Sequence, residues 1–400
     1  MEAIKRIYDY FMNKYFFIIK DFFAASVPYL FSYIFFLLPL KKNKFFCMSM
    51  AGKNYGDNIK CLSDYIKNYH PNAEVVWAFD RIFYEKVSCE YTKVKLYSFK
   101  YYYHISTAKY FLTNQQCRNI MYRKRHGQVK LQTWHGTALK RLGKDIVTSD
   151  ISKWVKLFTP NKNKYELRDT DIFIAGSRFM SDVFQNAYGW KNIYITGTPR
   201  NDIFFHDNES IIVKVCNHFN IIHKKIILYA PTFRSGADLT YYDIDLNWIK
   251  NYFENRDNCE YVILVRLHPN IMFKMNEFSK EHTVDFINAT LYPDVQELLY
   301  AADVLITDYS SVLFDFMYSY KPIILYVPDR LEYNRGFYLD IDSLPFIIVN
   351  SNKELPTALA SFDWSTYHRA YDVFFKRMGS AEDGRATVRV YDLLVNHFHE

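Results

Sequence analysis

The residues of this sequence that could do chemistry stand in short polar segments, each directly after an apolar run. In the first segment, Thr133–Thr137, His135 is followed by Gly136. An imidazole has a pKa near neutral and could take a proton from a hydroxyl, and a neighbouring glycine would leave it room to meet a substrate. The alternative is a histidine that only caps an element or completes a hydrogen bond. His135 is therefore a candidate general base.

Two further segments carry cationic groups that suit a phosphate. Strand alternation puts Arg266 and His268 on the same side of one run, and Pro269 would stop that strand. A lone Arg-x-His pair is more often surface decoration, and its position at a strand end only narrows the margin between this alternative and a functional role. Arg234 follows another apolar run and offers a guanidinium fork that matches phosphate oxygens. These side chains could together hold a diphosphate.

The fourth segment, Asp308–Ser311, joins the apolar run Val304–Thr307 to a stretch with helical apolar spacing. The hydroxyls of Ser310 and Ser311 and unpaired backbone N–H groups would then lie at the start of a helix, where the helix dipole favours an anion. Taken alone, such a residue is more often a simple cap. Near the C-terminus, Asp383 could likewise be no more than a helix start. The segments together predict an anion site with a base nearby.

The elements that position these segments alternate between strand, loop and helix. A first series of apolar runs extends from Phe45 to Asp202, and a second extends from Lys225 to Asp329. Parallel strands need crossover connections, so both series predict open α/β domains, which bind ligands at the carboxyl ends of their strands. We therefore expect two Rossmann-type domains, residues 45–210 and residues 211–400 with the final helices, that face one cleft.

Length and composition allow two such domains and exclude several classes of protein. The 400 residues carry a net charge of +7, but no run of Lys and Arg is long enough to indicate nucleic-acid binding. The mild positive charge suits an anionic membrane surface or an anionic substrate. The six cysteines are scattered without C-x-x-C spacing, which indicates free thiols in a reducing compartment and argues against a structural zinc.

The N-terminal residues 1–44 form a predicted membrane-associating segment. Within it, Phe22–Leu40 is uncharged over nineteen residues, and Lys41–Lys44 adds a basic cluster. Its length just reaches that of a spanning helix, so a single transmembrane anchor is one interpretation. We prefer an aromatic helix that lies in the interface, because Pro28 interrupts the run and the flanks are basic. Burial of the segment inside the protein is the third alternative.

A series of motifs resembles the CDP-glycerol glycerophosphotransferase family of teichoic acid synthesis. The resemblance covers roughly residues 45–395, with the motifs in the family's order. The motifs are WHGTALKRLGKD (Trp134–Asp145), GSRFMSDVF (Gly176–Phe184), ITGTPRND (Ile195–Asp202), LYAPTFR (Leu228–Arg234), RLHPN (Arg266–Asn270), DVQELLYAADVLITDYSSVLFDF (Asp294–Phe316) and EDGRA (Glu382–Ala386).

This resemblance implies a glycosyltransferase-B-like fold and transfer of an alditol phosphate from a CDP-activated donor, with release of CMP. It implies that residues 45–210 serve the acceptor and residues 211–400 the CDP donor. By position, His135 matches the histidine that acts on the acceptor hydroxyl, and His268 matches the one near the donor phosphates. The donor-side residues are then Arg234, Arg266, Thr307, Ser310, Ser311 and, with a less certain role, Asp383. The acceptor-side residues are Trp134, Gly136 and Thr137.

The expected reaction is transfer of glycerol phosphate from CDP-glycerol to a lipid-linked saccharide acceptor at the cytoplasmic face of the cell membrane. In length the chain resembles the single-domain priming enzymes. Ala138 stands where the family often has proline, and Ala386-Thr387 where it has Ala-Ser, which leaves the donor open. Alternatives are a ribitol-phosphate or other polyol-phosphate transferase of capsule synthesis, a nucleotide-sugar glycosyltransferase, and a non-catalytic nucleotide-binding scaffold. No cofactor or protein-bound metal is expected, although Mg²⁺ could accompany the donor diphosphate.

Overall fold

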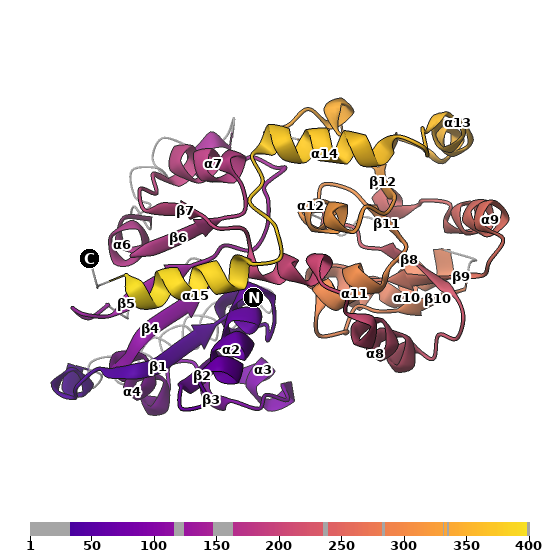
Figure 1. Ribbon diagram of the computed structural model, residues 1–400. Coiled ribbons are helices and arrows are strands. Elements are labelled where there is room, and N and C mark those ends of the chain that lie inside the picture. Colours follow the sequence, from indigo (N-terminus) through magenta and orange to yellow (C-terminus); the bar gives the residue numbers. More distant parts are fainter. Residues whose placement is uncertain are drawn as a thin grey trace, which may run out of the picture. The chain divides into compact units, whose positions relative to one another are not determined.

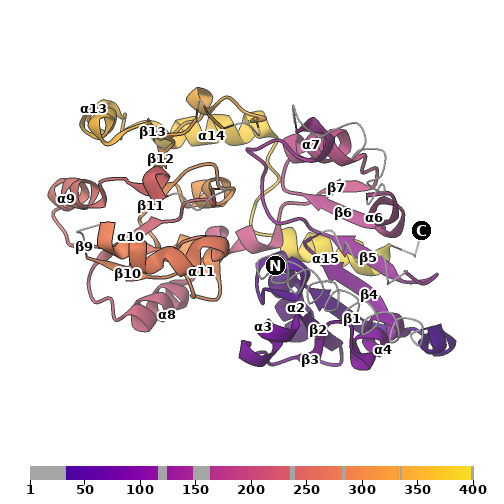
Figure 2. The same cartoon turned by 180° about the vertical axis from the view of Figure 1, so that it is seen from behind.

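The computed structural model describes residues 33–115, 124–146, 163–234, 239–281, 285–330, 332–333 and 336–397 of the chain. Strands and helices alternate along these residues and build two β-sheets, which can be followed from both sides in Figures 1 and 2. The α/β class predicted from the alternating pattern is confirmed.

The first sheet is formed by the N-terminal half of the chain. Its strands are β1 (Lys41–Met48), β2 (Glu74–Phe79), β3 (Thr92–Lys95), β4 (Ala108–Thr113), β5 (Val129–Gln132), β6 (Ile172–Ala175) and β7 (Ile193–Ile195). Their order is β3-β2-β1-β4-β5-β6-β7, and the pairs from β3 to β6 are parallel. The helices between them are α2 (Asp57–Tyr69), α3 (Arg81–Lys86), α4 (Phe99–Thr107), α6 (Asn163–Asp169) and α7 (Arg178–Tyr188).

The second sheet is formed by the C-terminal half. Its strands are β8 (Lys225–Tyr229), β9 (Tyr261–Val265), β10 (Phe286–Asn288), β11 (Val304–Thr307), β12 (Ile323–Tyr326) and β13 (Ile347–Val349), in the parallel order β10-β9-β8-β11-β12-β13. The helices of this half are α8 (Glu209–Phe219), α9 (Leu246–Asp257), α10 (Met275–Glu281), α11 (Val295–Ala301), α12 (Val312–Phe316), α13 (Leu355–Ser361), α14 (Tyr367–Met378) and α15 (Ala386–Asn396).

Both faces of the second sheet are covered, which explains why its strands are continuous apolar runs. Alternate residues of β8 enter different cores: Leu228 packs with residues of α8, α11, α12 and α14, whereas Ile227 packs with residues of α9, α10 and α13. Leu305 and Ile306 of β11 divide in the same way. Polar residues can therefore be accommodated only where these strands end.

The chain divides into two compact units. Unit 1 contains residues up to Trp134, Pro160–Phe173 and the residues from Val390 on, whereas unit 2 contains His135–Thr159 and Ile174–Arg389. Residues after Val390 thus group with unit 1, although the sequence assigned them to the second domain. The single boundary near residue 210 stays a prediction.

The N-terminal prediction can be compared with the structure from residue 33 on, because residues 22–32 lie outside the described residues. Tyr33–Leu37 forms a short 3₁₀ helix, and within the described ranges no helix is long and apolar enough to cross a membrane. The first strand begins at Lys41, so its predicted start at Phe45 is wrong. Lys44 is fully buried in this strand, with its Nζ 2.9 Å from Thr107 Oγ1 and 3.2 Å from Glu74 Oε1. Those partners make burial of the ammonium group tolerable.

Candidate functional site

Three of the predicted polar segments lie at one edge of the second sheet. Residues 230–234 follow β8, residues 266–268 follow β9, and residues 308–311 follow β11. β8 lies between β9 and β11, and all three strands are parallel. The carboxyl ends of neighbouring parallel strands meet at the same edge, so the structure brings these segments together as the sequence predicted.

Arg234 is the centre of a buried ionic cluster at this edge. The side chain is 6% exposed, its Nε lies 2.6 Å from Asp329 Oδ2, and its Nη1 lies 2.8 Å from Asp308 Oδ2. Its guanidinium group also lies over the ring of Tyr309, 4.9 Å from the centroid. Burial alone would lower the pKa of Arg234, but the two carboxylates outweigh this effect and raise it. Arg234 therefore ties the exits of β8, β11 and β12 together, and its contact with a donor phosphate stays a prediction.

The sequence reasoning missed Asp308 and Asp329 as members of this cluster. Asp308 also accepts hydrogen bonds from the backbone N–H and the hydroxyl of Thr232. The signal that could have found Asp329 is its position, since it follows the apolar run of β12 as the other polar segments follow theirs.

Thr307 and Arg266 support neighbouring backbone. Thr307 is fully buried, and its hydroxyl donates to the carbonyl oxygen of Ala230 at 2.7 Å. Arg266 donates from Nη1 to the carbonyl oxygens of Ala289 and Tyr292, at 3.1 and 2.7 Å. Burial lowers the pKa of Arg266. Both residues thus hold the sheet edge in shape, and their predicted contact with the donor remains untested.

His268 is half-buried beside the exposed Phe233, with 5.9 Å between the ring centroids. Burial, and next the positive charge of Lys140, lower the pKa of His268, while Asp308 acts in the opposite direction. The imidazole is therefore mainly neutral at neutral pH, with one nitrogen able to donate and the other able to accept. Lys140 comes from the segment that carries His135, which brings that segment towards His268.

The segment that begins at His135 belongs to unit 2 and packs on its core. Leu139 is buried in the same cluster as the residues of β11, and its carbonyl oxygen accepts from Tyr338 N at 2.8 Å. Arg141 N donates to the carbonyl oxygen of Gly336 at 3.0 Å. Although this segment follows β5 in sequence, its contacts in unit 2 place it against the second half of the chain.

Gly136 shows how closely this segment approaches the exit of β11. Its φ angle is +149°, and a Cβ atom at this position would lie 2.5 Å from Ser311 Oγ and 2.7 Å from Ser311 Cβ. No side chain fits there, so glycine is required both by the backbone conformation and by the contact. The backbone that follows His135 therefore lies against Ser311.

Ser310, Ser311 and Thr137 are half-buried, and Ser311 precedes α12 without a side-chain capping bond. Trp134 belongs to unit 1, where it is 9% exposed, has a φ angle of +55°, and accepts a hydrogen bond from Asn58 Nδ2 at 3.4 Å. The polypeptide thus passes from unit 1 to unit 2 between Trp134 and His135.

Comparison with known proteins identifies the family. The profile of the family described as "CDP-Glycerol:Poly(glycerophosphate) glycerophosphotransferase" matches residues 30–396, which is most of the chain. The chain belongs to the CDP-glycerol glycerophosphotransferase family. The resemblance drawn from the sequence motifs is thereby confirmed, and the protein is a member of a family of transferases.

Several curated relatives act in teichoic acid synthesis. The chain is 32% identical to the teichoic acid glycerol-phosphate transferase of Staphylococcus aureus over 373 residues, or 87% of this chain and 92% of that protein. It is 32% identical to a teichoic acid poly(glycerol phosphate) polymerase of Staphylococcus epidermidis over 86% of this chain, but it spans only 49% of that polymerase. It is 27% identical to a teichoic acid ribitol-phosphate primase of Bacillus spizizenii over 90% of this chain and 92% of the primase.

Solved structures of the wall teichoic acid polymerase TagF are similar in fold. One is a variant with a histidine replaced by alanine, at a TM-score of 0.77 and 28% identity over 92% of this chain and 94% of that chain. Another is a histidine-to-asparagine variant soaked with CDPG, at a TM-score of 0.75 and 28% identity over 90% of this chain and 91% of that chain. The predicted class, α/β with two Rossmann-type sheets of the glycosyltransferase-B-like kind, is confirmed.

The family motif EDGRA contains two acidic residues with different surroundings. Asp383, which the sequence reasoning chose, has a side chain 54% exposed and lies 2.7 Å from Arg389 Nη1. It also accepts from Arg385 N, and the hydrogen bond from Arg389 lowers its pKa. These contacts fit the helix start that the sequence left as an alternative, and a contact with the donor stays a prediction.

Glu382 is the residue of this motif that the sequence reasoning missed. Part of the residue reaches the surface, but its carboxyl group points inward and accepts from Thr198 N, Thr198 Oγ1 and Asn201 Nδ2. Burial of the carboxyl raises its pKa to about 8, although the hydrogen bonds from Thr198 and Asn201 act in the opposite direction. The two motifs EDGRA and ITGTPRND are therefore structural partners.

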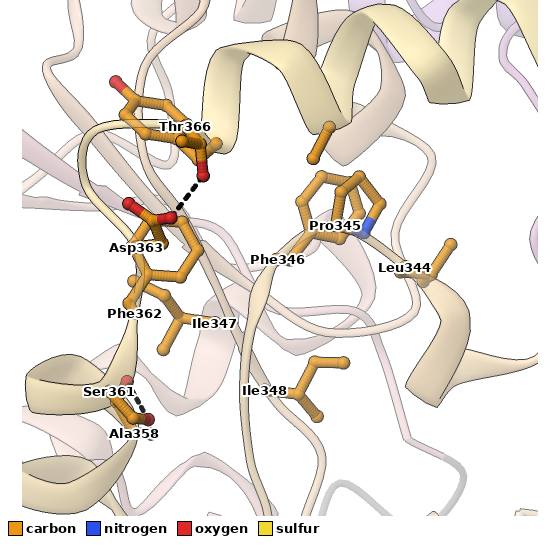
Figure 3. A pocket seen from close by; sticks show the side chains of 12 residues that line it. Leu344, Pro345, Phe346, Ile347, Ile348, Ala358, Ser361, Phe362, Asp363 and Thr366 are labelled. Atoms are coloured by element: carbon orange, nitrogen blue, oxygen red, sulfur yellow. Dashed lines mark hydrogen bonds between the residues drawn. The ribbon is translucent and has the colours of Figure 1, made fainter.

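Two other features of the structure lie apart from the predicted site residues or add no metal ligands to them. Within the described ranges, no three His, Cys, Asp or Glu side chains converge as metal ligands would. A pocket of about 450 Å³ lies among β13, α13 and α14, where Asp363 accepts a hydrogen bond from Thr366 (Figure 3). Its lining includes none of the predicted site residues.

Proposed function

We propose that this protein transfers glycerol phosphate from CDP-glycerol to a hydroxyl group of a lipid-linked saccharide and releases CMP. One structural observation supports this reaction above the others. Gly136, the residue after the candidate base His135, lies close to Ser311, one of the predicted phosphate contacts, and this closeness supports a shared site. Family membership adds the donor class, because the family's description names CDP-glycerol.

The reaction needs a deprotonated alcohol and a neutralised phosphate. The acceptor oxygen forms a bond to the phosphorus that carries glycerol, while the bond from this phosphorus to the bridging oxygen breaks and CMP leaves. His135 takes the proton of the acceptor hydroxyl as the new bond forms. His268, neutral because its pKa is lowered, donates a hydrogen bond to a phosphate oxygen, and the hydroxyls of Ser310 and Ser311 donate others.

Glycerol is the preferred alditol because the glycerol-phosphate transferase is 32% identical to this chain, compared with 27% for the ribitol-phosphate primase. Transfer of ribitol phosphate is the second candidate, and the similarity to that primase supports it. We place the reaction at the cytoplasmic face of the cell membrane, where a lipid-linked acceptor is presented. We propose no protein-bound metal, and Mg²⁺ would enter only with the donor diphosphate. The net charge of +7 supports contact with an anionic surface.

The decisive assay incubates the purified protein with CDP-glycerol and a lipid-linked disaccharide and follows CMP. CDP-ribitol is the competing donor, and samples with and without EDTA test the metal. Release of CMP from no CDP-alditol would overturn the proposal, and release of a nucleoside diphosphate from a nucleotide-sugar would show a glycosyltransferase instead.

His135→Ala tests the assignment of the base in the same assay. Loss of a general base should lower kcat by about 10²- to 10⁴-fold. Donor binding should survive, measured as the increase in melting temperature that CDP-glycerol produces. Equal loss of turnover and donor binding would show that His135 binds the donor. His268→Ala is the matched comparison, because we expect it to weaken donor binding as well as turnover.

A further inference from the structure

Arg200 is a buried residue of the ITGTPRND motif to which the sequence analysis assigns no role. It follows β7 in the segment Pro199–Phe205 and is 5% exposed. Its Nη2 lies 3.1 Å from Asp315 Oδ1 and 3.0 Å from Asp315 Oδ2. Asp315, on α12, also accepts a hydrogen bond from Gln296 Nε2 at 3.0 Å. Arg200 is therefore joined by a buried ion pair to the helix that follows the β11 exit.

The same guanidinium group lies against the backbone that carries His135. A Cβ atom added at Gly136 would lie 3.4 Å from Arg200 Nη2. Two atoms of Ser311 would lie closer to this Cβ atom. Ser311 and Asp315 are four residues apart at α12, so they share one face of the helix. The space beside the Cα atom of Gly136 is therefore occupied by Ser311 and by the arginine that is ion-paired to Asp315.

Glu382 accepts hydrogen bonds from residues on both sides of Arg200, from the backbone and hydroxyl of Thr198 and from the side chain of Asn201. Its carboxyl oxygens accept from Thr198 N at 2.9 Å and from Asn201 Nδ2 at 3.2 Å, and Thr198 Oγ1 adds a bond of 2.6 Å. The fit around this carboxyl is close, because a Cβ atom at Gly176 or Gly197 would lie 2.7 or 2.9 Å from one of its oxygens.

In a second contact, the acceptor belongs to the ITGTPRND motif and the donors are backbone N–H groups at the end of the EDGRA motif and just after it. The carboxylate of Asp202 accepts from the backbone N–H groups of Ala386 and Thr387, at 2.9 and 2.8 Å, where α15 begins. Residues on both sides of Arg200 are thus bonded to the segment that contains Glu382.

We propose that Arg200 is a positioning residue that holds the His135–Gly136 backbone against Ser311, supported by Asp315 and by Glu382. This inference rests on the proposed function only for its effect on turnover. Arg200 acts through the backbone of Gly136, because its guanidinium group is buried and ion-paired to Asp315. A positioning residue should alter kcat while the affinity for the donor stays nearly constant, because a small displacement of a catalytic group slows the reaction without removing a binding contact.

The test compares Arg200→Met, Arg200→Lys and Asp315→Asn with the exposed Arg369→Met on α14 as the control. For Arg200→Met we expect kcat to fall by about 100-fold while KM for CDP-glycerol stays within about threefold. Arg200→Lys should recover part of kcat, because it retains the charge but not the two-bond geometry. Asp315→Asn preserves the shape of the pair and should give a smaller loss. It replaces Arg200→Met if that variant does not fold.

Hydrogen exchange of the described residues 135–142 provides a readout that does not depend on turnover. Removal of the Arg200 side chain should speed exchange in this segment by about tenfold, while exchange in β1 and β4 of unit 1 is unchanged. Unchanged exchange and unchanged kcat in both Arg200→Lys and Asp315→Asn would overturn the proposal. So would a rise in KM with unaltered exchange, which indicates a direct substrate contact. If the wild-type protein turns over no CDP-alditol, the proposed function fails, but the exchange result still decides the positioning role.

Discussion

Arg234 and Arg200 are both buried in unit 2, but different numbers of carboxylates surround them. Arg234 lies between Asp308 and Asp329, so this cluster carries one more negative than positive charge. Arg200 faces Asp315, and the two charges balance. The pKa of about 8 keeps the Glu382 carboxyl mostly protonated at neutral pH, so this carboxyl adds little charge beside Arg200.

This difference separates a cluster that holds the ends of the strands from one that contacts the segment carrying the candidate base His135. The Arg234 cluster joins the exits of three strands and contains more carboxylates than cations, so it should matter most for stability. The Arg200 cluster joins α12 to the backbone of Gly136, so it should matter most for turnover. The predictions below test this division, beginning with the largest expected effect.

Arg234→Met should destabilise the protein by about 3–5 kcal/mol, because it leaves Asp308 and Asp329 buried without their shared cation. Urea unfolding measures the change, and the exposed Arg369→Met should alter stability by less than about 0.5 kcal/mol. A variant that keeps its stability but loses binding of CDP-glycerol would reverse our division. It would then show that Arg234 is the phosphate contact predicted from the sequence.

Gly136→Ala should lower kcat by about 10- to 100-fold, because the added Cβ must displace either Ser311 or the His135 backbone. Steady-state kinetics with CDP-glycerol measures the loss. Gly189→Ala is the matched control, since Gly189 also has a positive φ angle but no atom within 4 Å of the added Cβ. If both variants lose activity equally, backbone strain rather than the contact with Ser311 is responsible.

Glu382→Gln should change how stability depends on pH. The folded protein holds the Glu382 proton up to about pH 8, whereas the ordinary pKa of this group is 4.5. Its stabilising contribution is therefore complete below about pH 4.5 and is lost as the pH rises through 8, by at most about 1.4 kcal/mol per pH unit. Melting curves from pH 5 to 9 should show the wild type losing stability relative to Glu382→Gln. Parallel curves would mean that the carboxyl is ionised throughout, with Asp315 and Tyr318 as the charged or titratable neighbours to re-examine.

The sequence predicted the fold and the convergence of the polar segments because both depend on local patterns. Buried parallel strands are apolar runs, and the residue after each run lies at the same edge. The partners of charged residues could not be predicted in this way. Lys44 was assigned to a basic flank, but it is buried in β1, where its ammonium group contacts Glu74 and Thr107. Arg234 was predicted to contact phosphate. Its ion pair with Asp329 could not be predicted, because Asp329 follows a strand much later in the chain.

The different surroundings of Glu382 and Asp383 could not be predicted for a related reason. The two residues are adjacent and chemically alike, so no local pattern separates them. What separates them is the close approach of Gly176 and Gly197, which are distant in the sequence, to the carboxyl oxygens of Glu382. ITGTPRND entered the family resemblance as a motif, but Arg200 received no role, because its partner Asp315 lies on a distant helix.

Asp383→Asn should have the smallest effect. The exposed ion pair with Arg389 contributes little, and Arg389 retains its bonds to the carbonyl oxygens of Thr196 and Ala381. We expect a stability change within about 0.5 kcal/mol. CMP release should be unchanged if Asp383 only starts α15. A selective rise in KM for CDP-glycerol, with stability retained, would restore Asp383 to the donor site.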